Sequence, residues 1–163
     1  MPAKLIKGDK VADRLREEMA AELKDIYAET GQFPGLAVIV VGEDSASLSY
    51  VTNIESKSNA LGFNVMIHRL SVDVSEGELL QLIEELNYND NVHGIMIQLP
   101  LPEHINLHVV QEALDREKDV DVVHDVLIAA TGKPGLVKED WIKPGAMAIA
   151  MLLDNLIKAA RSS

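Results

Sequence analysis

Short apolar runs recur along the chain at intervals of about thirty residues, the length of a strand–helix–strand unit. Parallel strands in such units are joined by right-handed crossovers, which place helices on both faces of the sheet. The sequence therefore predicts an α/β fold: a three-layer α/β/α sandwich, Rossmann-like or flavodoxin-like, around a mostly parallel sheet of about four strands. The expected strands are 36–41, 64–70, 94–99 and 125–130, and our starting hypothesis for their order is 2-1-3-4.

Helical periodicity and capping residues occupy the intervals between these runs. Ser75 and Glu78 have the spacing of a capping box, Asn106 can cap a short helix, and Gly62 is suited to end one. Pro144 suits the first turn of a last helix. The expected helices are 9–30, 46–61, 76–87, 107–114 and 144–161.

The totals of the sequence restrict the class of protein. The 163 residues fit one domain, and the formal net charge of −11 argues against nucleic acid and against an anionic membrane surface as partners. There is no cysteine, which excludes disulfides and thiolate sites, and the histidine spacing favours no metal. No secretory signal is visible and no apolar run could span a bilayer, so we expect a cytoplasmic protein.

Polar residues follow two of the expected strands, at the sheet edge where ligands bind in folds of this type. The hydroxyl-rich stretch 42–51 fits either a ligand site or a helix cap, and composition favours the cap. Gln98, late in an apolar strand, either bonds local backbone or faces a polar pocket. The stretch KDVD at 118–121 fits a solvated acidic turn, although Asp119 and Asp121 would point the same way in an extended chain.

One set of segments carries a family resemblance: LAVIVVGEDSASLSYV at 36–51, GF at 62–63, VHGIMIQLPLPEHIN at 92–106 and EKDVD at 117–121. In order and spacing they resemble the bifunctional methylenetetrahydrofolate dehydrogenase/cyclohydrolases. The resemblance implies one domain, 1–163, made of a folate-site part, a remnant of the family's nucleotide-binding domain and its C-terminal helix. These parts are residues 1–121, 122–146 and 147–163, respectively.

The resemblance breaks after residue 121. In the family, KDVD is followed by glycine and then by a long dinucleotide-binding domain. Here Val122 stands in that place, and no G-x-G-x-x-G motif occurs anywhere in the chain. The nucleotide-binding domain is thus expected to be largely deleted. The family uses NADP or NAD, but for this chain we expect no cofactor.

The resemblance also implies roles for individual residues. Tyr50 matches a tyrosine that lines the folate pocket, and Gln98 matches the glutamine that hydrogen-bonds a catalytic lysine. Asp121 matches the aspartate that holds the pterin ring, and Pro100 and Leu101 are expected to contribute to the substrate pocket. Tyr50 and Gln98 are therefore the candidate catalytic residues, and all five are candidate substrate-binding residues.

The catalytic lysine itself is missing. Its position, four residues after Tyr50, is occupied by Ile54, which can neither donate nor accept a proton. Lys57 lies one turn further along, about 5 Å away along the helix, and we expect it to face solvent rather than to substitute.

The leading hypothesis is a truncated or engineered relative of the family that binds a tetrahydrofolate-type small molecule. It should lack both NADP-dependent hydride transfer and cyclohydrolase activity. One alternative is a structural or designed module with no ligand, and another is an active folate one-carbon enzyme with a rearranged pocket. In the family the nucleotide domain makes most of the dimer contact, so we expect a monomer or a weak homodimer.

Overall fold

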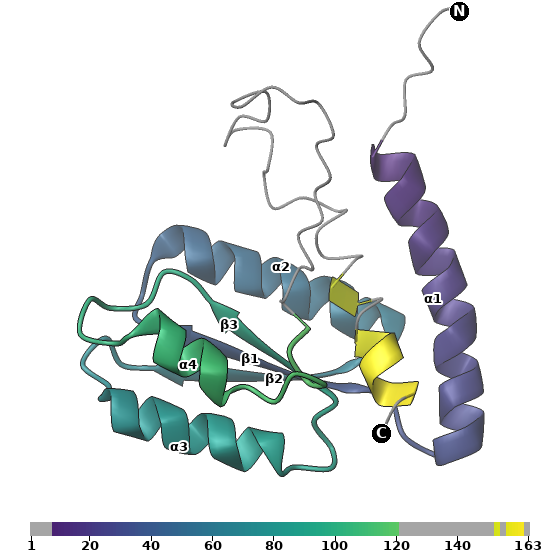
Figure 1. The fold of residues 1–163 in the computed structure, drawn as a ribbon. Helices are drawn as coiled ribbons and strands as arrows, with labels where there is room; N and C mark the ends of the chain where they lie inside the picture. Colours follow the sequence, from purple (N-terminus) through teal and green to yellow (C-terminus); the bar gives the residue numbers. More distant parts are fainter. Residues whose placement is uncertain (1–7, 121–151, 154–155, 162–163) are drawn as a thin grey trace, which may run out of the picture.

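A three-stranded parallel sheet forms the centre of the molecule in the computed structural model, which describes residues 8–120, 152–153 and 156–161. β1 (Gly35–Val41) lies between β2 (Asn64–Leu70) and β3 (Gly94–Gln98), as Figure 1 shows. All seven β1 residues are buried, as its unbroken apolar sequence predicts, and the more polar β2 forms an edge of the described sheet. The order β2-β1-β3 agrees with the 2-1-3-4 hypothesis for these strands. The run 125–130 lies outside the described residues.

Helices cover both faces of the sheet (Figure 1). α2 (Ser45–Leu61) lies on one face, while α3 (Glu76–Asn87) and α4 (Leu107–Ala113) lie on the other. α1 (Gly8–Thr30) packs its buried residues into the core on the α2 side. The predicted α/β fold with a parallel sheet is therefore confirmed.

The predicted caps set the ends of these helices. Gly62 ends α2 in the left-handed conformation, with φ of 99°, and its N–H donates to the carbonyls of Asn59 and Ser58. At the start of α3, the Ser75 hydroxyl accepts from the Glu78 N–H while the Glu78 carboxylate accepts from the Ser75 N–H. Short local signals therefore determine where α2 stops and α3 begins.

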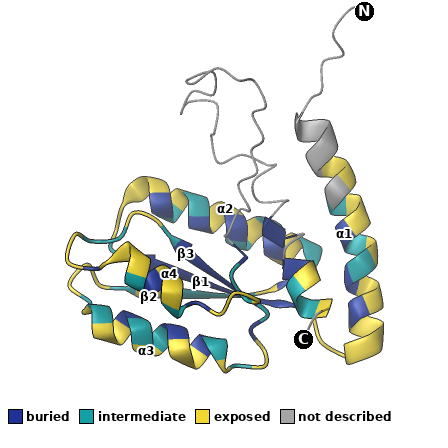
Figure 2. Ribbon diagram, viewed as in Figure 1, coloured by how far each residue is buried: buried dark blue, intermediate teal, exposed yellow. Residues whose placement is uncertain are grey.

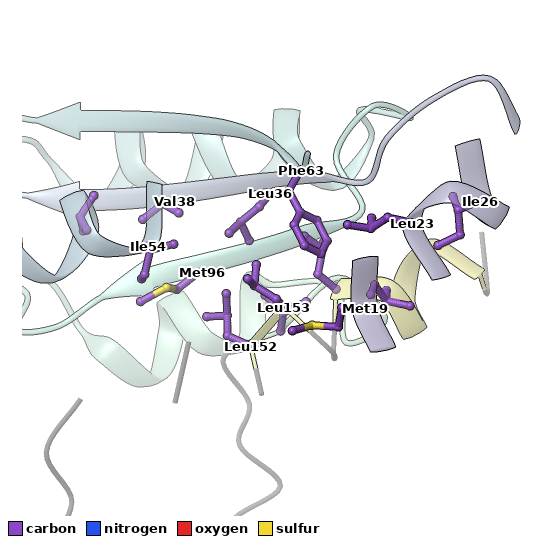
Figure 3. Close-up of a cluster of buried hydrophobic side chains, with 14 of the residues drawn as sticks. Met19, Leu23, Ile26, Leu36, Val38, Ile54, Phe63, Met96, Leu152 and Leu153 are labelled. Carbon is purple, nitrogen blue, oxygen red and sulfur yellow. The ribbon is translucent and has the colours of Figure 1, made fainter. Parts of the chain in front are cut away.

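Two hydrophobic cores flank the sheet, because successive strand side chains point to opposite faces. Each helix buries the side that faces the sheet and exposes the other (Figure 2). The α2-side core (Figure 3) contains Met19, Leu23, Ile26, Leu36, Val38, Val40, Val51, Ile54, Phe63, Met96, Val120, Leu152, Leu153, Leu156 and Ile157. The α3-side core contains Ala37, Ile39, Val41, Leu79, Ile83, Leu86, Val92, Ile95, Ile97, Ile105, Val110 and Leu114.

The described C-terminal residues, 152–153 and 156–161, are helical and pack into the α2-side core. Gly94 makes room for them, because a Cβ there would lie 2.7 Å from both Leu156 Cδ1 and Val120 Cγ1. The remainder of the expected helix 144–161 lies outside the described residues. Within the described part of the chain, no helix has the length and apolar character needed to cross a membrane.

Candidate functional site

The turn from β1 into α2 lies at the carboxyl edge of the sheet. Asp44 caps α2, and its carboxylate accepts from the Ser47 N–H at 2.8 Å and from the Ser47 hydroxyl at 2.9 Å. The same hydroxyl lies 3.2 Å from the Leu99 carbonyl, which ties the start of α2 to the segment after β3. The backbone hydrogen bond from Ser47, followed by the hydroxyl bond, lowers the pKa of Asp44. Ser47 therefore serves as a structural cap and crosslink at this edge.

Gln98 ends β3 on the side of the sheet that faces α2, two residues beyond Met96 of the α2-side core. Its amide nitrogen donates to the Leu99 carbonyl at 2.7 Å. Its amide oxygen Oε1 is buried and has no hydrogen-bond partner among the described residues. Both interpretations of Gln98 therefore hold in part. Its amide nitrogen bonds local backbone, and its amide oxygen is an acceptor without a donor.

Tyr50 and Ile54 lie one turn apart on α2 and face the same core. Tyr50 is half-buried and packs against the α2-side core, while Ile54 is fully buried within it, together with Val38 and Met96 (Figure 3). Lys57 is half-buried and lies off the face that buries Val51, Ile54 and Ser58. The structure therefore places an aliphatic side chain one turn after Tyr50, on the face of α2 that packs against β1 and β3.

The remaining predicted site residues fall in different places. Pro100 is exposed, and the peptide bond before it is cis. Leu101 is half-buried and packs against the α3-side core, on the opposite side of the sheet from Tyr50. Asp121 lies outside the described residues, directly after the buried Val120. Of the five candidates, the structure brings Tyr50 and Gln98 to the same face.

The KDVD stretch is more than a solvated turn. Asp119 forms a parallel bridge with Ile95 of β3, and the Val120 side chain is only 3% exposed. The turn itself is present, because the Lys118 and Asp119 N–H groups donate to the Asp115 carbonyl, but residues 119–120 lie against β3 instead of being solvated. The acidic composition of this segment alone could not predict that it contacts β3 and the α2-side core.

Arg69 was missed by the sequence analysis. Arg69 and Gln98 both pair with Val40, so they occupy the same row across the sheet, one strand to either side of β1. Arg69 is exposed and lines a cavity of about 720 Å³ at the carboxyl ends of β1 and β2. The other lining residues are Gly42, Glu43, Leu48, Leu70, Ser71 and Val72. Only the strand register, which the sequence does not reveal, places Arg69 in that row.

No group of three or more His, Asp or Glu side chains suited to a metal ion occurs within residues 8–120, 152–153 and 156–161. The chemistry available at the α2-side edge is that of a phenol, an amide, the Arg69 guanidinium and an apolar wall. Such a set suits a flat, largely apolar ligand whose polar groups meet a few fixed hydrogen-bonding atoms.

Fold and edge together define a parallel α/β domain, a class in which ligands bind beyond the carboxyl ends of the strands. The family model for the tetrahydrofolate dehydrogenase/cyclohydrolase catalytic domain matches residues 6–121, and the chain belongs to this family. The bifunctional protein FolD of Desulfosudis oleivorans is 45% identical over 126 residues, which are 77% of this chain and 42% of that protein. The chain thus spans less than half the length of that relative.

Solved structures agree with this assignment. The bifunctional FolD methylenetetrahydrofolate dehydrogenase/cyclohydrolase from Campylobacter jejuni superposes with a TM-score of 0.68 at 35% identity, covering 70% of this chain and 40% of that one. The Trypanosoma brucei enzyme gives a TM-score of 0.69 at 32% identity, covering 74% and 41%, respectively.

The expectation of no cofactor is wrong for the family to which the chain belongs, because the Trypanosoma brucei structure is a complex with NADP cofactor and an inhibitor. The prediction rested on the missing glycine-rich motif of this chain, although the family was expected to use NADP or NAD. Within the described residues, the turn after β1 does not fit a pyrophosphate. The Asp44 carboxylate already accepts from the first free N–H groups of α2, and it would repel an anion.

Proposed function

We propose that the chain binds a tetrahydrofolate-type ligand at the α2 side of the sheet's carboxyl edge and does not catalyse cyclohydrolysis. Ile54 carries this proposal: it is fully buried at the position where the family resemblance expects a proton-transferring lysine. Its side chain can neither donate nor accept a proton. Tyr50, Gln98 and Asp121 would hold the ligand, with Pro100 and Leu101 forming the wall after β3.

Gln98 supports the same proposal. A buried acceptor without a partner is uncommon in folded proteins, and its neighbourhood usually explains it. In this chain the unpaired Oε1 of Gln98 lies on the same face as Ile54. A lysine ammonium at residue 54 would be a donor for such an acceptor, so the orphan oxygen fits the loss of a basic partner.

The decisive experiment restores the missing group. In Ile54→Lys, we expect enzyme-dependent hydrolysis of methenyltetrahydrofolate, followed by its absorbance, with a gain of about a hundredfold or more over the unsubstituted chain. Val51→Lys is the matched control, because Val51 is also fully buried on α2 but lies one turn from the expected position. Circular dichroism establishes that both variants fold. Hydrolysis by the unsubstituted chain, or an equal gain in both variants, would contradict the proposal.

Ligand binding is tested separately by titration calorimetry with a folate analogue. We expect binding that weakens in Tyr50→Ala and in Asp121→Ala, because Asp121 can accept two parallel N–H bonds from the pterin. Binding that is unaffected by both substitutions would contradict the proposed pose, whatever the result at residue 54.

NADP-dependent hydride transfer is a second part of the proposal. The 163 residues contain no G-x-G-x-x-G motif, and we propose that these residues by themselves do not reduce NADP with methylenetetrahydrofolate. The assay is NADPH absorbance, and turnover above background would contradict this part alone. A cytoplasmic location and a monomeric or weakly dimeric state complete the proposal, and light scattering tests the latter.

One observation favours a structural module without a ligand. Ile54 and Met96 lie in one continuous apolar core with Leu152 and Leu153 (Figure 3), so part of the α2 face is already filled by the chain itself. Calorimetry distinguishes the two functions, because the structural module predicts no heat of binding with any folate analogue.

A further inference from the structure

A groove of about 660 Å³ lies between α3 and α4, on the face of the sheet opposite α2 (Figure 1). Its apolar lining comes from Leu80 of α3 and from Val109, Ala113 and Leu114 in or directly after α4. Leu114 is buried, and the other three side chains are half-buried. This α3–α4 groove is separate from the proposed folate site, because the sheet lies between them.

One side chain fixes the distance between the two helices at their carboxyl ends. The Asn87 amide nitrogen donates to the Ala113 carbonyl at 2.8 Å, and the Asn87 amide oxygen accepts from the Asp115 N–H at 3.1 Å. All three residues line the groove. The groove is therefore held open by the chain itself, which reduces the entropy lost when a partner binds.

The rim of the groove is acidic. Glu84 of α3, Glu112 of α4 and Asp115 line it, and all three are exposed. No lysine or arginine is among the residues that line it. An apolar floor with carboxylates along its rim favours a partner that combines an apolar side chain with a positive charge.

Three basic side chains nearby do not remove this negative charge. The His108 ring lies 3.4 Å from the Glu112 carboxylate and adds charge only when it is protonated. The Lys118 ammonium donates to two backbone carbonyls, at the end of α3 and just after it. Arg116 follows Asp115 in the sequence but does not line the groove. The net charge of −11 on the whole chain adds to the attraction for a cationic partner.

Tyr88, directly after α3, lines the same groove and is 82% exposed. It is the most exposed large hydrophobic side chain in the described part of the chain. Exposed aromatic side chains are typical of the residues that dominate protein interfaces. A tyrosine ring can also bind a cation on its face, and arginine does this more often than lysine. The ring and the carboxylates therefore favour the same kind of partner.

We propose that the α3–α4 groove docks a short segment of a partner protein in which an arginine or lysine lies beside an apolar side chain. The apolar side chain contacts Leu80 and Ala113, and the cation lies between Tyr88 and the carboxylates of Glu84 and Glu112. A groove of this volume holds only a few side chains, so the contact is transient and sensitive to salt. This inference does not depend on the proposed folate site.

Two short helical peptides test the proposal on the full chain. They share the same leucines and differ only in carrying arginine or glutamate at the remaining charged positions. The arginine peptide should shift the NMR amide signals of α3 and α4 and leave those of α2 unchanged, and added salt should weaken its binding. The glutamate peptide should cause no shift.

Substitutions at the rim locate the contact. Glu84→Gln combined with Glu112→Gln should weaken binding of the arginine peptide about fivefold or more, and Tyr88→Ala should weaken it about threefold. The control combines Glu85→Gln with Glu103→Gln, which removes as many exposed charges outside the groove and should change affinity less than about twofold at physiological salt. Circular dichroism establishes that each variant folds.

Several results would overturn the proposal. No binding of the arginine peptide, equal binding of the glutamate peptide, or equal weakening in the control variant would each do so. Equally strong shifts of the same amides by spermidine would indicate a site for small cations instead of a protein segment. Light scattering that shows a dimer, lost on combining Glu84→Gln with Glu112→Gln, would assign the groove to a second copy of this chain.

Discussion

The two faces of the sheet differ in which of their buried polar atoms have hydrogen-bond partners. On the α3 side, the capping box at Ser75 is complete, and Asn87 bonds both the Ala113 carbonyl at 2.8 Å and the Asp115 N–H at 3.1 Å. On the α2 side, the Ser58 hydroxyl and the Gln98 amide oxygen are buried without a partner among the described residues. A third such atom, Nε2 of His68, lies on the α3 side, because His68 of the edge strand β2 pairs with Ile39 of the α3-side core.

The position of Gln98 at the carboxyl edge, rather than the number of unpaired atoms, separates a supporting face from a candidate binding face. Buried polar atoms are normally paired, so unpaired ones indicate where a partner has been lost or where a ligand belongs. On the α2 face, the orphan oxygen of Gln98 shares the core side with Ile54, the residue that departs from the family pattern. The α3 face instead carries the Ser75 capping box and the two Asn87 hydrogen bonds, which hold the ends of α3 and α4 in place.

Matched truncations of one isoleucine on each face give the largest expected effect. Ile54 and Ile83 are both fully buried, one in each core, so each substitution to alanine should lower the free energy of unfolding by about 2–5 kcal/mol. Urea denaturation measures the loss. Only Ile54→Ala should also change the affinity for a folate analogue, because Ile54 lies beside Tyr50 and Ile83 lies across the sheet.

Ile83→Ala serves as the control for Ile54→Ala. If Ile83→Ala altered folate affinity as much as Ile54→Ala, while both variants remained folded at the assay temperature, the two faces would not be functionally distinct. Equal stability losses with no change in affinity for either variant would also contradict the assignment of the α2 face as the binding face.

Removing a serine hydroxyl should have opposite consequences on the two faces. Ser75→Ala deletes the cap of α3 and should cost about 1 kcal/mol of unfolding free energy. Ser58→Ala deletes a buried hydroxyl without a partner and should leave stability unchanged or raise it by up to about 1 kcal/mol. Both values follow from denaturant midpoints. A clear loss in Ser58→Ala would show that its hydroxyl has a partner in solution.

Much of the fold could be predicted because its signals are local. The capping pair Ser75 and Glu78, the C-cap Gly62 and the unbroken apolar run of β1 each act within a few residues, and the structure has each where it was expected. The length of the repeating unit then restricted the topology to parallel strands with crossovers.

The site was less predictable because it depends on register and on distant contacts. Arg69 enters the row of Gln98 only through the pairing of both with Val40. Leu101 is adjacent to Pro100 in sequence but packs on the opposite face from Tyr50. The anchoring of Lys118 to the end of α3 joins residues about thirty positions apart, and no local pattern encodes such a contact.

The smallest predicted effect concerns His93, at the start of β3. Its Nδ1 accepts a hydrogen bond from the Gly35 N–H at 3.1 Å, which requires that this nitrogen carry no proton. Burial, and then the positive charge of Lys118, lower the pKa of His93 from 6.5. The unfolded chain therefore binds a proton more readily than the folded one, so stability should be constant well above pH 6.5 and should fall as the pH drops below it.

Urea midpoints at pH 8 and pH 5.5 measure this loss, and the lower pH stays above the titration of the carboxyls of Asp44 and Glu78, whose hydrogen bonds lower their pKa. In His93→Asn the amide oxygen can accept from the Gly35 N–H but does not titrate, so the decline between the two pH values should be smaller than in the unsubstituted chain. An equal decline in both proteins would mean that His93 contributes nothing to it. In Lys118→Met the nearby positive charge is absent, so the pKa of His93 should lie closer to 6.5 and the decline should be smaller. That result would show that Lys118, bound near the end of α3, affects the residue that precedes β3.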